Sequence, residues 1–167
     1  MEELGRKFHL VRVPQDGNCL FTAFGVGLNI MKVLGESGGL AELANVPLDY
    51  TAKELSKQLD PRSFGQAATF YRDTAIDVIR ANPRAFRRLI EFEWHNAAST
   101  RTPDSTAVLL CRERVLRATA AGAQPPDDME TMIDAYTHVM ARDKVFGQRV
   151  ELEALIYKFG SFHTNSP

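Results

Sequence analysis

The sequence predicts an α+β domain in which helices flank a small β-sheet. Helical periodicity covers most of the chain. One β-rich segment, FHLVRV at residues 8–13, predicts a strand near the N-terminus. A turn, QDGN, separates that strand from the first helix, so Cys19 should begin the helix. We therefore expect a single domain across residues 1–167, with this first helix at its centre.

Apolar residues at helical spacing predict most of the other elements. In the first helix they recur from Leu20 to Leu34, and the segment GESGG at residues 35–39 should end it. Asp127 and Asp128 are candidate N-caps for the helix that begins at Met129. A short helix is a candidate at residues 51–59. Longer amphipathic segments predict helices at residues 70–82, 83–94, 106–121, 129–140 and 151–159.

Composition and charge exclude several classes of function. The net charge of −1 gives no basic field for nucleic acid or for an anionic membrane. No apolar run approaches the roughly 20 residues that a membrane-spanning helix needs. Two distant cysteines and a charged N-terminus favour a reducing compartment, so we expect the protein in the cytoplasm. We also expect it to be a monomer. Neither C-x-x-C nor H-E-x-x-H occurs, so no metal site is expected.

Cys19 is the candidate nucleophile. At the first turn of a helix, free N–H groups and the positive end of the dipole favour a thiolate, which is the reactive form. The turn residues Asp16, Gly17 and Asn18 would present backbone N–H groups that can hold the negative oxygen of a tetrahedral intermediate. Gly17 has no Cβ, so a substrate backbone could come close to the turn.

A buried structural role is the alternative for Cys19, because free cysteine is among the most buried residue types. The same reasoning applies to Cys111, which we expect to lie in the core. It falls on a stripe of apolar residues along the predicted helix at residues 106–121. That stripe consists of Val108, Cys111, Val115 and Ala118.

The stretch VPQDGNCLFTAF at residues 13–24 resembles the nucleophile motif of the ovarian-tumour (OTU) family of cysteine proteases. Two later segments are similar to the family in the same order. YRDTAIDVIRANPRAF at residues 71–86 resembles the family's central helix, and VFGQRVELEALIYKF at residues 145–159 resembles its Glu-Leu helix. The resemblance covers about residues 8–159, with a poorly matching part at residues 95–126.

This resemblance implies a papain-like OTU fold and the activity of a deubiquitinating cysteine protease. Cys19 would attack the isopeptide carbonyl at the C-terminus of ubiquitin or a ubiquitin-like modifier, and a histidine would move the proton. The backbone from Asp16 to Cys19 would form the oxyanion hole, which makes Asp16 a catalytic residue and Gly17 and Asn18 substrate-binding residues. No cofactor is required, and the partners are ubiquitin conjugates.

His163 is the candidate general base. In the segment FHTNS it is followed two residues later by Asn165, and a His-x-Asn spacing is typical of the family's terminal motif. In the family, however, strands separate this motif from the Glu-Leu helix. Either those late strands are missing and FHTNS is the terminal motif, or the chain is shortened and the match is accidental. For His9, His95 and His138 we expect ordinary structural roles.

Three functional hypotheses follow, and each predicts a different environment for Cys19. An active OTU-type protease requires a histidine imidazole near the Cys19 sulfur. An OTU-like pseudoenzyme or fragment, which binds ubiquitin without turnover, would have an exposed Cys19 with no base in reach. An α-rich interaction domain with a structural cysteine would bury Cys19 fully.

Overall fold

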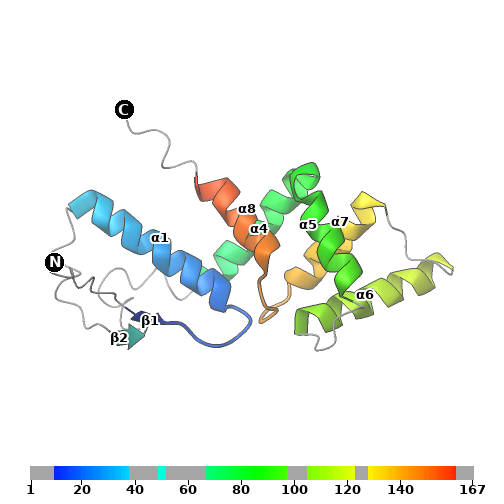
Figure 1. The fold of residues 1–167 in the computed structure, drawn as a ribbon, viewed down its shortest axis with the longest axis horizontal. Helices are drawn as coiled ribbons and strands as arrows, with labels where there is room; N and C mark the ends of the chain where they lie inside the picture. Colours follow the sequence, from blue (N-terminus) through cyan, green and yellow to red (C-terminus); the bar gives the residue numbers. More distant parts are fainter. Residues whose placement is uncertain (1–9, 38–48, 52–66, 98–104, 123–127, 161–167) are drawn as a thin grey trace, which may run out of the picture.

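A computed structural model describes residues 10–37, 49–51, 67–97, 105–122 and 128–160 of the chain. Within these ranges it contains six helices and two short strands (Figure 1). The strands are β1 (Leu10–Arg12) and β2 (Asp49–Thr51). The helices are α1 (Cys19–Ser37), α4 (Ala67–Ala81), α5 (Pro83–Asn96), α6 (Ser105–Ala121), α7 (Met129–Met140) and α8 (Arg149–Phe159).

The predicted α+β fold is wrong, because the structure is helix-rich and has almost no sheet. Helices account for 79% of the described residues, which leaves too few for a second structural layer. β1 and β2 have three residues each and pair in parallel, with Leu10 opposite Asp49. No residue of β1 belongs to the hydrophobic core. Strands this short offer no face against which helices could pack, so the layered papain-like arrangement is not observed.

The central helix is α4 rather than α1. It packs against α1, α5, α7 and α8, and its residues Ala75 and Ile79 are fully buried. Figure 1 shows α1 and the strands on one side and α5, α6 and α7 on the other. The first turns of α1 reach the core, where Phe21 is fully buried. No helix in the described ranges is both long and apolar enough to cross a membrane.

The helix boundaries follow from local chemistry, and most were predicted. Asp128 caps α7, since its carboxylate accepts a hydrogen bond of 2.9 Å from the Thr131 N–H. Pro83 is the first residue of α5, where its missing N–H removes no hydrogen bond. At the start of α8, the Gln148 N–H donates to Glu151 Oε2 over 2.8 Å. The helix predicted at residues 51–59 lies largely outside the described residues.

The predicted buried stripe of α6 is wrong. Val108 and Val115 are 50% and 59% exposed, and Cys111 is partly exposed, whereas Leu110 is only 1% exposed. The buried face also contains Glu113, which pairs with Arg117 and Arg142. Arg117 in turn pairs with Asp134 of α7 at 2.9 Å. The buried face of α6 is therefore mixed, with Thr106, Leu110 and Glu113 buried, whereas the predicted apolar stripe is partly or largely exposed.

Candidate functional site

Cys19 is the first residue of α1, as predicted, and the residue is partly exposed. The hypothesis of a structural cysteine requires complete burial, and this partial exposure contradicts it. The Cys19 N–H donates to the Asp16 carbonyl over 3.0 Å. The first turn of a helix leaves N–H groups without intrahelical partners. Cys19 therefore lies at the positive end of the α1 dipole.

Asp16 holds the turn that precedes Cys19. Its carboxylate Oδ1 accepts a hydrogen bond of 3.0 Å from the Asn18 N–H. Its carbonyl accepts the bond from Cys19, and the Asn18 carbonyl then accepts the Thr22 N–H over 2.9 Å. The N–H groups of Asn18 and Cys19, which were expected in the oxyanion hole, are thus bound to Asp16 here. An oxyanion at these donors would have to replace Asp16 as the acceptor.

Arg72 of α4 is a site residue that the sequence did not reveal to us. It is only 3% exposed, and its guanidinium carbon lies 4.4 Å from the centre of the Phe21 ring. Its Nη1 donates to one oxygen, and the two N–H groups of its Nη2 are shared among three more, on two separate segments. The acceptors are the carbonyls of Gly17 (3.0 Å), Met140 (2.7 Å) and Val145 (2.7 Å) and the Asn18 side-chain oxygen (2.8 Å).

The environment of Arg72 explains why a cation can stay buried there. Burial lowers the pKa of the guanidinium, and nearby carboxylates, Glu151 foremost, act in the opposite direction. An arginine remains protonated under such conditions because its ordinary pKa is above about 12. A buried charge is tolerated when it is hydrogen-bonded. Arg72 is therefore a fixed positive group behind the Cys19 turn.

The segment at residues 141–148 closes the other side of the turn. The Asn18 Nδ2 donates to the Asp143 carboxylate over 2.9 Å, and this hydrogen bond lowers the pKa of Asp143. Lys144 has a positive φ of 61°, and its carbonyl lies against Gly17 so closely that a Cβ on Gly17 would overlap it. Gly17 is thus required for the contact with this segment.

Glu151 and Tyr136 form a buried polar pair in α8 and α7. Both are fully buried, and burial raises the pKa of Glu151 to about 7. The pKa of Tyr136 is also raised, first by burial and then by Glu151. Neither the Tyr136 hydroxyl nor Glu151 Oε1 has a hydrogen-bond partner of good geometry in the described structure. Sequence reasoning assigned no role to either residue.

The general base stays a prediction. His163, its partner Asn165 and His9 lie outside the described residues. His95 and His138 are exposed on α5 and α7, and His95 Nδ1 is 2.7 Å from the Glu91 carbonyl of its own helix. Within the described ranges, no hydrogen bond joins a histidine to Cys19.

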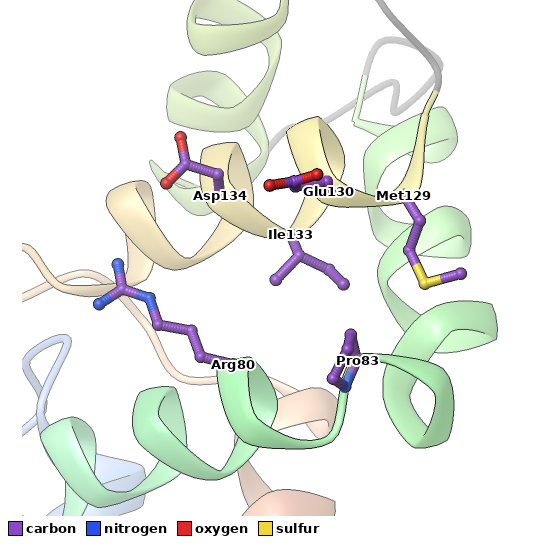
Figure 2. A pocket seen from close by; sticks show the side chains of 6 residues that line it. All are labelled: Arg80, Pro83, Met129, Glu130, Ile133 and Asp134. Carbon is purple, nitrogen blue, oxygen red and sulfur yellow. The ribbon is translucent and has the colours of Figure 1, made fainter.

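A pocket of about 540 Å³ lies between the end of α4, the start of α5 and α7 (Figure 2). Its charged residues are already partly engaged: Arg80 Nε donates to Thr137 Oγ1 over 3.2 Å, and Asp134 pairs with Arg117. None of the candidate site residues lines it, so it is separate from the Cys19 turn. The lining residues are Arg80, Pro83, Met129, Glu130, Ile133 and Asp134.

Comparisons of the chain with protein-family models, with curated proteins and with solved structures gave no match. We therefore infer the function from the residues around Cys19 and from the sequence motif that contains it.

Proposed function

We propose that the chain is a cysteine-dependent hydrolase of the deubiquitinase type, with Cys19 as its nucleophile. The observation that carries this proposal is a partly exposed cysteine at the first residue of α1, after a turn that is held from two sides. The resemblance of DGNCLFTAF to the OTU nucleophile motif supports the choice of substrate. The motif and the start of α1 at Cys19 are local features, and neither requires the α+β fold that the structure contradicts.

In the proposed reaction the Cys19 thiolate attacks the isopeptide carbonyl at the C-terminus of ubiquitin or a ubiquitin-like modifier. The C–N bond breaks, and the lysine amine leaves with a proton donated by a histidine, for which His163 is our candidate. Water then hydrolyses the thioester, which releases the modifier's carboxylate and restores the thiol. Both cysteines are free thiols, as a reducing compartment would keep them, and we place the reaction in the cytoplasm.

A second candidate function is ubiquitin binding without turnover. It is favoured by the backbone of the turn, since the N–H groups of Asn18 and Cys19 are bound to Asp16. With these donors occupied, the developing oxyanion has less stabilisation and a thioester forms slowly. Such a protein would still have a reactive Cys19, so the two functions differ in turnover rather than in thiol chemistry.

Hydrolysis of a fluorogenic ubiquitin C-terminal amide tests the proposal. We expect the unchanged chain to release the fluorophore, and we expect Cys19→Ala and His163→Ala to abolish the release. Cys111→Ala and His138→Ala are the matched controls, because each removes the same side chain elsewhere, and both should keep the activity. A folded chain that binds ubiquitin but cleaves no amide would contradict the hydrolase and support the binding function.

A further inference from the structure

We propose that Arg72 is the positioning residue of the Cys19 site. Its guanidinium fixes the peptide unit between Gly17 and Asn18, and it thereby fixes the direction in which Cys19 enters α1. This inference rests on the proposed function of Cys19 and adds a residue to it. Arg72 itself is buried, so it acts through the turn and does not touch the substrate.

The peptide unit between Gly17 and Asn18 is held at both of its ends. A trans peptide is planar, and its carbonyl and N–H point in opposite directions. Here the Gly17 carbonyl accepts from Arg72 over 3.0 Å, and the Asn18 N–H donates to the Asp16 carboxylate over 3.0 Å. A rotation of this peptide plane would break both hydrogen bonds, so Arg72 and Asp16 together set its orientation.

The side chain of Asn18 is also held at both ends. Its Oδ1 accepts from Arg72 over 2.8 Å, and its Nδ2 donates to Asp143 over 2.9 Å. The residue immediately before Cys19 is therefore fixed in its main chain and in its side chain. Since Asn18 also accepts the first helical hydrogen bond from Thr22, its position decides where α1 begins.

Arg72 also holds the segment that faces the turn. The carbonyls of Met140 and Val145, 2.7 Å from its nitrogens, lie on either side of Lys144, whose carbonyl contacts Gly17. One planar guanidinium with five N–H donors can serve acceptors on both segments. A lysine ammonium is compact and has three donors, so it would keep the charge without joining the two segments.

The test compares Arg72→Lys with Arg80→Lys, a matched change of an exposed arginine on the same helix. The alkylation rates of Cys19 and Cys111 by iodoacetamide are measured in each folded variant by peptide mass spectrometry. Folding is verified by far-ultraviolet circular dichroism. We expect Arg72→Lys to slow the alkylation of Cys19 by about tenfold, because a turn that is no longer fixed displaces the thiol from the helix N-terminus that favours its reactive form. The alkylation rate of Cys111 in Arg72→Lys, and the rates of both cysteines in Arg80→Lys, should stay within about twofold of those in the unchanged chain.

Kinetics of the fluorogenic ubiquitin amide add a readout that a purely structural role would not change. Arg72→Lys should lower kcat by about tenfold and leave KM within about twofold, because Arg72 does not contact the substrate. If the unchanged chain does not cleave at all, the proposed hydrolase fails while the alkylation rates still test Arg72. A folded Arg72→Lys with the original Cys19 rate would overturn the role of Arg72.

A second variant keeps the proposal testable if Arg72→Lys does not fold. Asn18→Ala removes one acceptor of Arg72 and leaves the three carbonyls in place. It also removes the hydrogen bond from Asn18 Nδ2 to Asp143. We expect this variant to fold and to slow the alkylation of Cys19 by about threefold, since two side-chain hydrogen bonds of the turn are lost while the Gly17 carbonyl stays bound to Arg72. An alkylation rate equal to that of the unchanged chain would overturn the proposal.

Discussion

The two cysteines occupy different kinds of position although both are partly exposed and both lie on helices. Cys19 is the first residue of α1, after a turn that Arg72 and Asp143 hold. Cys111 lies inside α6, where the preceding residues are already helical. The stabilisation of negative charge by a helix N-terminus falls off within the first turn. Solvent exposure alone therefore does not distinguish a reactive cysteine from an ordinary one.

Gly17→Ala should reduce the difference in reactivity between Cys19 and Cys111 more than any other substitution. The added Cβ would overlap the Lys144 carbonyl, so the turn or the segment at residues 141–148 must shift. We expect a loss of about 2–3 kcal/mol in the free energy of unfolding, typical of an overpacked contact. The alkylation rate of Cys19 should fall toward that of Cys111. Urea denaturation and peptide mass spectrometry measure the two effects, and an unchanged stability would contradict the close contact.

Glu151→Gln should change how the free energy of unfolding depends on pH. Glu151 interacts with Arg72, which holds the Cys19 turn. Burial raises the pKa of Glu151 from 4.5 to about 7, so the folded state binds more protons than the unfolded state between these values. The folded protein therefore loses stability as the pH rises from about 4.5 through about 7. Gln stays neutral, so above pH 7 the variant should be more stable than the original by about 2–3 kcal/mol.

Glu113→Gln is the matched change on the Cys111 side of the molecule. Glu113 is also buried, but it pairs with Arg117 and Arg142 at 3.0 and 3.7 Å. This variant should lose about 1–2 kcal/mol at neutral pH, because two arginines lose a charged partner. Urea denaturation between pH 4.5 and pH 8 measures both glutamine variants. Equal pH dependence in the original chain and in Glu151→Gln would argue against a buried, ionising Glu151.

Gly27→Ala should have the smallest effect and serves as the control for Gly17→Ala. Gly27 is exposed on the same helix, and a Cβ there would meet no atom within 4 Å. Alanine favours the helix, so we expect a gain of about 0.5–1 kcal/mol in the free energy of unfolding. The alkylation rates of both cysteines should not change. A slower Cys19 in this variant would show that the rate responds to α1 as a whole rather than to the turn.

The helices were predictable because their signals are local. Apolar spacing, the N-cap at Asp128 and the first-turn proline at Pro83 lie within a few residues of the boundaries that they determine. The fold class was predicted wrongly, since the α+β fold was inferred from a family resemblance and from one strand-like segment. The described sheet pairs Leu10–Arg12 with Asp49–Thr51, two segments far apart in the sequence. The buried face of α6 also escaped prediction, because it depends on packing against α5 and α7 and not on the apolar pattern of α6 alone.

The candidate site was predictable only in part. The Asp-Gly turn and the start of α1 at Cys19 followed from residue types in one short stretch. The role of Arg72 depends on contacts with residues 54 to 73 positions away along the chain, which no local pattern contains. One signal was present: Arg72 shares a helical stripe with Ala75 and Ile79, where an apolar residue would be expected. A charged residue on such a stripe indicates a buried polar site.

Competitive alkylation of the two cysteines in one molecule tests the central claim most directly. A limiting amount of iodoacetamide is added to the unchanged chain at pH 7, both in buffer and in concentrated urea, and the two labelled peptides are quantified. We expect Cys19 to react about tenfold faster than Cys111 in buffer, because only Cys19 lies at a helix N-terminus. In urea the two rates should be nearly equal. Equal rates in buffer, or a faster Cys111, would contradict the assignment of Cys19 as the nucleophile.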